Sequence, residues 1–195
     1  MKNKIICLIS FILFLVSIIF VANYSFFDNY IINLFKYRSD VLTNIMKIIT
    51  FFGSVLMILI LTVLFVIFVK GKRNKLLIFI NVIVVTLLNQ LLKYVFQRER
   101  PTNSIIEETG YSFPSGHSMV SMAFYGFLIY LVYKSNMKFK GLIISFISIL
   151  IFLIGISRIY LGVHYPSDVL GGFTLSLSYL IIFIDITKPN FTYMD

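Results

Sequence analysis

The chain has 195 residues, of which 59% are hydrophobic and 13% are charged, and its mean hydropathy is +0.95. Soluble domains average about 45–50% apolar and about 25% charged residues, so this composition excludes an ordinary water-soluble domain and a disordered chain. The single cysteine, Cys7, excludes an internal disulfide and a multi-cysteine metal site. The net charge of +9 would suit nucleic acid, but basic residues on so apolar a chain more often lie in cytoplasmic loops, and we predict no nucleic-acid partner.

Six apolar segments follow one another, and we predict that each is a transmembrane helix of an all-α integral membrane protein. Their lengths, roughly 15 to 22 residues, suit helices that cross a bilayer, whereas barrel strands would alternate over about 10 residues. Backbone polar groups in hydrocarbon need partners within the segment, which favours helices. The predicted spans are residues 5–22, 48–69, 76–96, 118–133, 142–156 and 169–184 of a single domain covering 1–195.

The first segment, Ile5 to Ala22, also invites comparison with a cleaved signal peptide. Its apolar stretch of 18 residues exceeds the usual length of about 7–15. Phe20 stands two positions before Ala22, where a cleavage site needs a small residue. We therefore expect a retained helix.

The basic residues predict the topology. With the N-terminus in the cytoplasm, 10 of the 17 lie on the cytoplasmic side near helix ends, where the positive-inside bias is counted. These ten are Lys2, Lys4, Lys70, Lys72, Arg73, Lys75, Lys134, Lys138, Lys140 and Lys188. The seven on the outer side are Lys36, Arg38, Lys47, Lys93, Arg98, Arg100 and Arg158. We predict a multi-pass protein of the cell membrane with both termini in the cytoplasm.

The longest connection runs from Asn23 to Lys47. Apolar side chains recur in it at three- and four-residue steps, at Phe26, Phe27, Tyr30, Ile31, Leu34 and Phe35. The residues between them include Asp28, Asn29, Asn33 and Lys36. This pattern is typical of an amphipathic helix at the membrane interface, and the alternative is a loop packed on the bundle.

The first polar stretch on the predicted outer side runs from Lys93 to Pro101. Lys93 and Arg100 are seven residues apart, which would place them on one face of a helix. The residue before a proline is disfavoured in a helix, however, so we expect Arg100 to begin an extended loop. Taken alone, Lys93 also fits a lysine that extends from a helix end to the interface.

The second stretch is Ser112-Phe-Pro-Ser-Gly-His-Ser118, directly before the fourth apolar segment. A helix start presents free N–H groups and the positive end of the helix dipole, and Gly116 lets the backbone come close to an anion. The same residues also fit an ordinary helix start without a ligand.

The third stretch, Ser157 to Asp168, joins the fifth and sixth segments. His164 and Asp168 are four residues apart, so one helical turn brings them together. A carboxylate that accepts from one imidazole nitrogen orients the other, as a nucleophilic or general-base histidine requires. The alternative is an acidic helix start beside a hydrogen-bonded histidine.

Together these stretches hold both histidines of the chain and three cations that need a counter-anion near lipid. The cations are Lys93, Arg100 and Arg158. A neighbouring glutamate, Glu99, Glu107 or Glu108, could supply the negative charge. A phosphate suits the planar arginine fork better.

The residues resemble the three-part signature of the type 2 phosphatidic acid phosphatase family, whose superfamily includes soluble acid phosphatases and vanadium haloperoxidases. The parts are Lys93-x6-Arg100-Pro101, Pro114-Ser115-Gly116-His117 and Ser157-Arg158-x5-His164-x3-Asp168. All three are present and in order, without a departure. Within the family the chain is similar to small bacterial membrane members, phosphatidylglycerophosphatase B and undecaprenyl pyrophosphate phosphatases.

The resemblance implies a role for each matched residue. His164 is expected to attack phosphorus, Asp168 to orient His164, and His117 to protonate the leaving group and then activate water. The implied phosphate-binding residues are Lys93, Arg100, Ser115, Gly116 and Arg158. The family needs no metal or other cofactor, and the sequence offers no metal-type cluster of acidic and histidine residues near the motifs.

The implied function is metal-independent hydrolysis of a terminal phosphate from a membrane lipid phosphate or pyrophosphate, through a phosphohistidine, on the outer face. The implied partners are the substrate and membrane lipids, with no obligatory protein partner. Transfer of the phosphate to another acceptor is the alternative. A non-catalytic binder or transporter would need only the cations, so the two histidines and Asp168 argue against it. Haloperoxidases are soluble and much larger.

Overall fold

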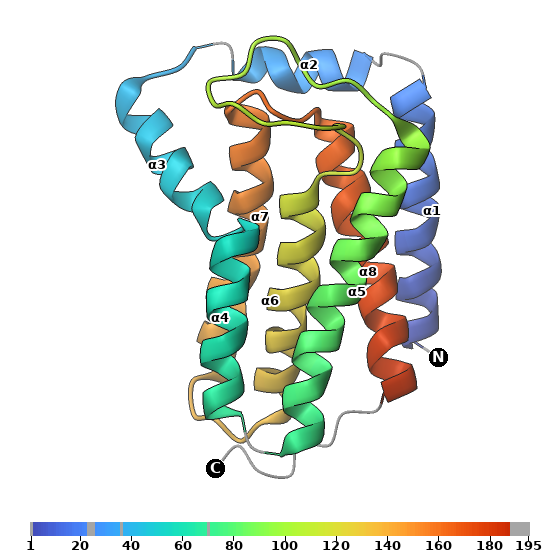
Figure 1. The fold of residues 1–195 in the computed structure, drawn as a ribbon, viewed down its shortest axis with the longest axis vertical. Coiled ribbons are helices and arrows are strands. Elements are labelled where there is room, and N and C mark those ends of the chain that lie inside the picture. Colours follow the sequence, from blue (N-terminus) through green and yellow to red (C-terminus); the bar gives the residue numbers. More distant parts are fainter. Residues whose placement is uncertain (1, 23–25, 36, 70, 188–195) are drawn as a thin grey trace.

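The computed structural model describes residues 2–22, 26–35, 37–69 and 71–187. These residues form eight helices and no strand, in agreement with the predicted all-α class (Figure 1). The helices are α1 (Lys2–Ala22), α2 (Phe26–Leu34), α3 (Asp40–Phe51), α4 (Val55–Phe68), α5 (Lys72–Phe96), α6 (Gly116–Lys134), α7 (Lys140–Tyr160) and α8 (Pro166–Thr187).

The helices form a bundle around α6, which packs against α4, α5, α7 and α8, while α1 lies along α8 (Figure 1). One end of the bundle holds the first turn of α1, the connection between α6 and α7 and the last turn of α8. Helix α2 and the loop of residues 97–115 lie at the opposite end. Three basic residues of the topology prediction, Lys36, Lys70 and Lys188, lie outside the described residues.

The lengths of the helices support a multi-pass membrane protein. Helices α5 to α8 are each long and apolar enough to cross a membrane, and α3 with α4 adds a fifth span if the bent pair counts as one. Residues Lys4–Ile19 of α1 form a shorter apolar helix. The predicted number of six spans therefore stays a prediction.

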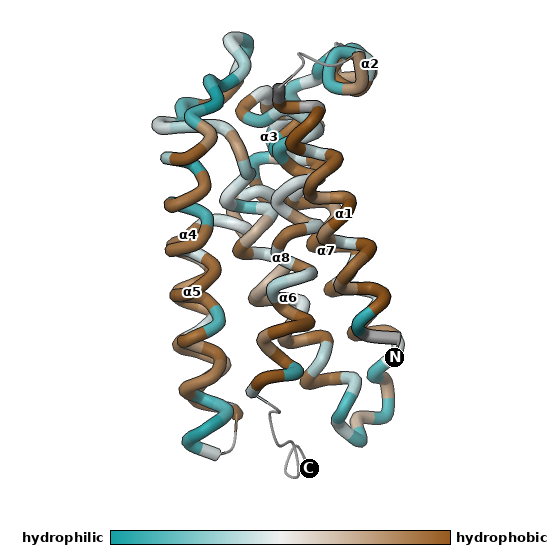
Figure 2. The backbone as a smooth tube through the Cα atoms, turned by 90° about the vertical axis from the view of Figure 1, so that its right-hand side faces the viewer, coloured by the Kyte–Doolittle hydropathy of each residue, from teal (hydrophilic) through white to brown (hydrophobic). Residues whose placement is uncertain are grey.

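The outer surface of the bundle is apolar. Figure 2 shows hydrophobic stretches along α1, α4 and α5 and hydrophilic residues towards the two ends of the molecule. In α4, for example, the exposed side chains include Leu56, Ile60 and Val63. A helix that is apolar on all sides suits burial on one face and lipid on the other.

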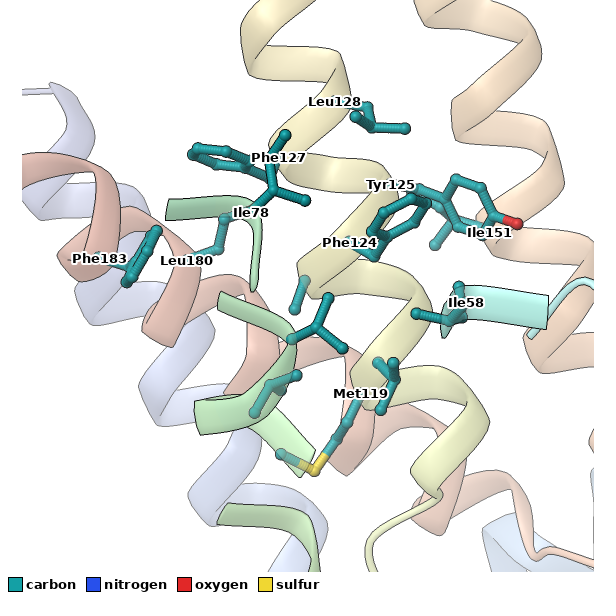
Figure 3. Close-up of a cluster of buried hydrophobic side chains, with 14 of the residues drawn as sticks. Ile58, Ile78, Met119, Phe124, Tyr125, Phe127, Leu128, Ile151, Leu180 and Phe183 are labelled. Atoms are coloured by element: carbon teal, nitrogen blue, oxygen red, sulfur yellow. The ribbon is translucent and has the colours of Figure 1, made fainter. Parts of the chain in front are cut away.

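The core of the bundle surrounds α6. Phe124 and Phe127 of α6 are almost fully buried, and they pack with Ile58 of α4, Ile78 of α5 and Phe183 of α8 (Figure 3). Each such side chain contributes about 1.5–3 kcal/mol relative to its exposure to water. This packing joins α4, α5, α6 and α8 into one bundle.

The predicted span 48–69 is not one continuous helix, because α3 and α4 meet at a bend of 49°. Ser54 starts α4 as its N-cap, accepting the backbone N–H three residues further on. The Tyr125 hydroxyl donates to the Phe52 carbonyl at 2.8 Å, which holds the corner against α6. A Cβ on Gly53 would lie only 2.5 Å from Ile154 Cγ2, so the corner approaches α7 too closely for a side chain. The pair Gly53-Ser54 within the apolar run is the sequence signal for this interruption.

Helix α2 forms within the predicted amphipathic segment, and it lies across the end of the bundle (Figure 1). Its placement at a membrane interface stays a prediction. Asp28, expected between the apolar residues, is only 2% exposed. It accepts a hydrogen bond from the Ser167 backbone N–H at 2.8 Å, so α2 is joined to the start of α8.

A small second apolar cluster fixes α3 and the loop of residues 97–115 to the end of α7. Met46, Tyr160, Leu161 and Val163 form its buried part. The Ile105 backbone N–H also donates to the Leu161 carbonyl at 2.9 Å. The loop is therefore held over the ends of the helices.

Candidate active site

His164 and Asp168 lie together where α7 ends and α8 begins. His164 Nδ1 is 3.4 Å from Asp168 Oδ2, and both side chains are buried. Because α8 begins at Pro166, Asp168 occupies the first helical turn and His164 lies two residues before the helix. The two side chains are in contact as predicted, but not through one helical turn, because His164 lies outside α8.

Two neighbours define which nitrogen of His164 carries the proton. Arg100 Nη1 lies 3.2 Å from His164 Nε2, and an arginine only donates, so Nε2 is the acceptor. The proton therefore belongs on Nδ1, which faces the carboxylate of Asp168. This tautomer leaves Nε2 with the lone pair that a nucleophile needs.

The environment of His164 favours the neutral imidazole. Burial lowers its pKa from 6.5 to about 4, with the nearby Arg158 and Arg100 charges acting in the same direction and Asp168 only partly opposing them. At neutral pH the side chain is therefore uncharged and holds its lone pair.

We expect this buried imidazole to make the fold sensitive to acid. Its folded pKa of about 4 lies below the unfolded value of 6.5, so the unfolded chain binds more protons between these limits, and stability is lost as the pH falls from 6.5 to 4. The loss amounts to at most about 3 kcal/mol. Thermal unfolding in detergent, measured from pH 7 to 4, should show a steeper loss for the natural protein than for His164→Gln. If the stability of both proteins fell equally with pH, the acid sensitivity would not come from His164.

Arg100 lies in the loop after α5, as its position before Pro101 predicts. Three backbone carbonyls receive its N–H groups, those of Gly110 at 2.9 Å, Thr109 at 3.0 Å and Val163 at 2.9 Å. These contacts fix the guanidinium beside His164.

Arg158 of α7 and Lys93 of α5 lie at the same end of the bundle. Arg158 is 1% exposed, and its Nη1 donates to Thr50 Oγ1 of α3 at 2.8 Å. Its Nη2 donates to Glu108, while its Nε is buried and has no hydrogen-bond partner among the described residues. Lys93 Nζ donates to the Tyr111 carbonyl. The three predicted cations are therefore gathered around the loop of residues 97–115.

Glu108 supplies the negative charge between two of these cations. Its carboxylate pairs with Arg158 and lies 3.8 Å from Arg100 Nη2. Partial burial alone would raise the pKa of Glu108, but the Arg158 charge and hydrogen bond outweigh this effect, so the pKa is lowered. Of the three glutamates named from the sequence, Glu99 and Glu107 are exposed, and Glu108 is the one that pairs with the predicted cations.

The start of α6 holds the remaining predicted residues. Ser115 is the N-cap, and its oxygen accepts from the Ser118 N–H and hydroxyl at 3.4 and 3.0 Å. The N–H groups of Gly116 and His117 belong to the first turn, which lacks intrahelical partners. The Ser115 backbone N–H donates to the Asp168 carbonyl at 3.1 Å, which joins the start of α6 to the start of α8. The helix start thus faces the same cluster.

Four residues of this region were not predicted as site residues. Ser112 is fully buried and donates to Asp168 Oδ2, and Arg98 Nη1 donates to Asp168 Oδ1 at 2.6 Å. In the sequence, Arg98 is one of several basic residues on the predicted outer side, and Thr50 lies in an apolar run, so neither is marked as a site residue. Asp28 is separated from Arg98 by 70 residues, so no local pattern relates them.

The described residues contain no group of three or more His, Cys, Asp or Glu side chains that could hold a metal ion. Arg100 lies beside Nε2 of His164, and Arg158 and Lys93 lie at the same end of the bundle. Chemically, the arrangement can bind a tetrahedral anion next to a neutral, oriented imidazole.

Comparison with known proteins identifies the family. Residues 74–191 match the PAP2 superfamily. Phosphatidylglycerophosphatase B of Bacillus subtilis (strain 168) is 42% identical over 95 residues, which are 47% of each chain. Undecaprenyl-diphosphatase of Sulfolobus acidocaldarius is 29% identical over 137 residues, 66% of this chain and 63% of that protein. The crystal structure of the first transmembrane PAP2 type phosphatidylglycerolphosphate phosphatase from Bacillus subtilis is 31% identical, with a TM-score of 0.81.

The chain spans about half the length of the first of these curated relatives and less than two thirds of the second. The solved structure covers 92% of this chain and is itself covered to 96%, so the helical membrane fold is shared almost from end to end. The names of the relatives agree with the predicted enzyme class, a lipid phosphate phosphatase. Because the family match extends over more than half of the chain, the protein belongs to the PAP2 superfamily.

Proposed function

We propose that this protein is a metal-independent membrane phosphatase that removes the terminal phosphate from a lipid phosphate or pyrophosphate. The observation that carries the proposal is the position of His164 Nε2, which lies 3.2 Å from Arg100 while Nδ1 faces Asp168. The buried Nε of Arg158, which lacks a partner among the described residues, is a donor that a phosphate oxygen would satisfy.

The proposed reaction has two steps. In the first, the Nε2 lone pair of His164 attacks phosphorus, the bond from phosphorus to the lipid oxygen breaks, and His117 gives that oxygen a proton. Asp168 stabilises the positive imidazolium that forms. In the second, His117 takes a proton from water, whose oxygen attacks phosphorus, and the phosphorus–nitrogen bond breaks to release inorganic phosphate and neutral His164.

The cations would stabilise the charge on the equatorial oxygens in both steps. Lys93, Arg100 and Arg158 are held by backbone or side-chain acceptors, so little reorganisation is needed when charge develops. The N–H groups at the start of α6, with the Ser115 hydroxyl, complete the proposed phosphate site. Fixed positive charge would thus take the place that magnesium has in kinases.

The substrate class is tested by phosphate release from purified protein in detergent, with a chelator present. Undecaprenyl pyrophosphate, phosphatidylglycerophosphate, phosphatidic acid and diacylglycerol pyrophosphate should be compared side by side, because all present a terminal phosphate. We expect release from at least one. No release from any of the four would overturn the proposal, and a phosphorylated acceptor among the products would favour phosphate transfer instead.

The site is proposed to face the outside of the cell membrane. Supporting this, the predicted cytoplasmic residues that the structure describes, such as Lys72, Lys134 and Lys140, border helix ends away from the site. A reporter fused to the C-terminus and active only in the cytoplasm should give a signal. A signal from a reporter active only outside would contradict this orientation.

We expect Glu108 to compete with phosphate for Arg158 and Arg100. Glu108→Gln removes the negative charge between these cations, so orthovanadate, a phosphate analogue, should inhibit about tenfold more strongly, a change of about 1.4 kcal/mol. The inhibition constant is measured with a lipid phosphate substrate. Glu107→Gln, at an exposed neighbouring position, is the matched control and should leave the constant unchanged. An unchanged constant in Glu108→Gln would mean that phosphate binds without displacing Glu108.

A further inference from the structure

A second group of charged residues lies on the far side of Asp168 from His164. Arg98 Nη1 is 2.6 Å from Asp168 Oδ1, and Arg98 Nη2 is 2.8 Å from Asp28 Oδ2. All three side chains are buried, with exposed fractions of 9% for Arg98, 2% for Asp28 and 0% for Asp168. Burying a charged side chain is costly unless the charge is paired. Here the Arg98 guanidinium lies between the carboxylates of Asp28 and Asp168 and pairs with both.

Arg98 holds the carboxylate oxygen that His164 does not use. Asp168 Oδ2 faces His164 Nδ1 and accepts from Ser112 and from the Tyr165 N–H at 2.8 Å. Oδ1 accepts a hydrogen bond from Arg98, so both oxygens of the Asp168 carboxylate are hydrogen-bonded and the carboxylate cannot rotate freely. The Arg98 guanidinium also lies 4.0 Å from the centre of the Tyr165 ring, which fixes its own plane.

Asp28 connects this arrangement to α2. Its Oδ1 accepts the Ser167 N–H at 2.8 Å, and its Oδ2 accepts the Ser167 hydroxyl at 2.7 Å. Ser167 is the second residue of α8, whose first N–H groups lack intrahelical partners, so Asp28 caps α8 from another helix. The turn that it caps carries Asp168.

The net charge of the group gives a reason for having two carboxylates, Asp28 and Asp168, beside the single guanidinium of Arg98. Arg98 alone beside Asp168 would neutralise the carboxylate, and little negative charge would remain to stabilise a positive imidazolium on His164. With Asp28 on the other side, the three groups together carry one negative charge. The charged groups on the substrate side are Arg100, Arg158 and Lys93, with Glu108 paired to Arg158 and 3.8 Å from Arg100.

We propose that Arg98 and Asp28 are positioning residues for phosphoryl transfer: Arg98 orients the Asp168 carboxylate towards His164, and Asp28 holds Arg98 and preserves the negative charge that His164 needs. The inference rests on the proposed function. It makes α2, outside the three-part motif, part of the catalytic assembly. Since neither residue touches the phosphate site, their loss should affect turnover rather than substrate binding.

The test compares kcat, KM and orthovanadate inhibition for four variants in detergent. These are Arg98→Gln, Arg98→Lys, Asp28→Asn and the double variant with Arg98→Gln and Asp28→Asn. Arg38→Gln and Asp40→Asn, at exposed positions of the same region, are the matched controls. Thermal unfolding and gel-filtration profiles identify variants that fail to fold.

We expect Arg98→Gln to lower kcat about 100-fold and Asp28→Asn about tenfold, with KM and the vanadate constant within about twofold of the natural protein. Arg98→Lys should lie between Arg98→Gln and the natural protein, because an ammonium reaches one carboxylate but does not bridge both. In the double variant, Asp28→Asn should lower kcat no further, because Asp28 acts through Arg98.

Three outcomes would overturn the inference while the natural protein remains active. One is a kcat within about twofold of the natural value in folded Arg98→Gln or Asp28→Asn. Another is a tenfold fall in kcat when Asp28→Asn is introduced both into the natural protein and into Arg98→Gln. This result would mean that Asp28 acts only as a cap of α8 and not through Arg98. The third is a rise in KM equal to the fall in kcat/KM. If Arg98→Gln does not fold, Arg98→Lys and Asp28→Asn decide the question. A natural protein that releases no phosphate would instead overturn the proposed function.

Discussion

Replacing His164 by alanine should abolish phosphate release, with a loss of about 10⁴-fold or more in kcat. The variant lacks the Nε2 atom that Arg100 contacts and that is proposed to form the bond to phosphorus. His117, the other histidine of the chain, lies at the start of α6 and is assigned to proton transfer, so it does not replace the nucleophile. Inorganic phosphate released from a lipid phosphate is the measurement.

Binding provides the control for His164→Ala. Lys93 and Arg158 keep their contacts in this variant, so it should still bind a radiolabelled lipid phosphate within about tenfold of the natural affinity, and no phosphoprotein should form. Turnover within tenfold of the natural rate would show that the reaction does not pass through His164.

Replacing His117 by asparagine should separate the two steps of the proposed reaction. With a lipid monophosphate, which needs a proton on its leaving oxygen, we expect a loss of about 10²–10⁴-fold in kcat. With p-nitrophenyl phosphate, whose leaving group departs without a proton, the first step should survive. The second step still needs a base, so a single burst of nitrophenol and a trapped phosphohistidine are expected.

The measurement for His117→Asn is a rapid-quench time course with 32P-labelled substrate. A burst of one nitrophenol per protein, with label that is stable to alkali and lost in acid, would support both roles of His117. The double variant with His164→Ala serves as the control and should show no burst. Steady nitrophenol release at the natural rate would contradict the assignment of His117.

The local parts of the site could be predicted from the sequence because they depend on short spacings. The short spacing from His164 to Asp168 predicts that the two side chains meet, and their 3.4 Å contact agrees, although His164 lies in the turn before α8 rather than in the helix. Pro101 predicts that Arg100 leaves the helix, and the structure places Arg100 in the loop. The all-α class follows in the same way from continuous apolar runs.

The parts that were missed depend on contacts between distant segments. Asp28 fits the polar face of an amphipathic helix, but its partners Arg98 and Ser167 are 70 and 139 residues away. The bend between α3 and α4 lies at Gly53, where a side chain would meet Ile154 of α7, and the periodicity of the segment does not encode that approach. Packing partners of this kind become visible only when the helices are assembled.

The glutamate between the cations has a consequence for how the proposed phosphate site is filled and emptied. Glu108 already pairs with Arg158, so phosphate binding at the proposed site would be an exchange of one anion for another. The affinity is then a difference between two similar attractions, which keeps both the substrate and the inorganic phosphate product from being held too tightly. When the product leaves, Glu108 is the nearby group that can restore neutrality beside Arg158. In this way the proposed phosphate site would combine fixed cations with an apolar surrounding and still allow repeated turnover.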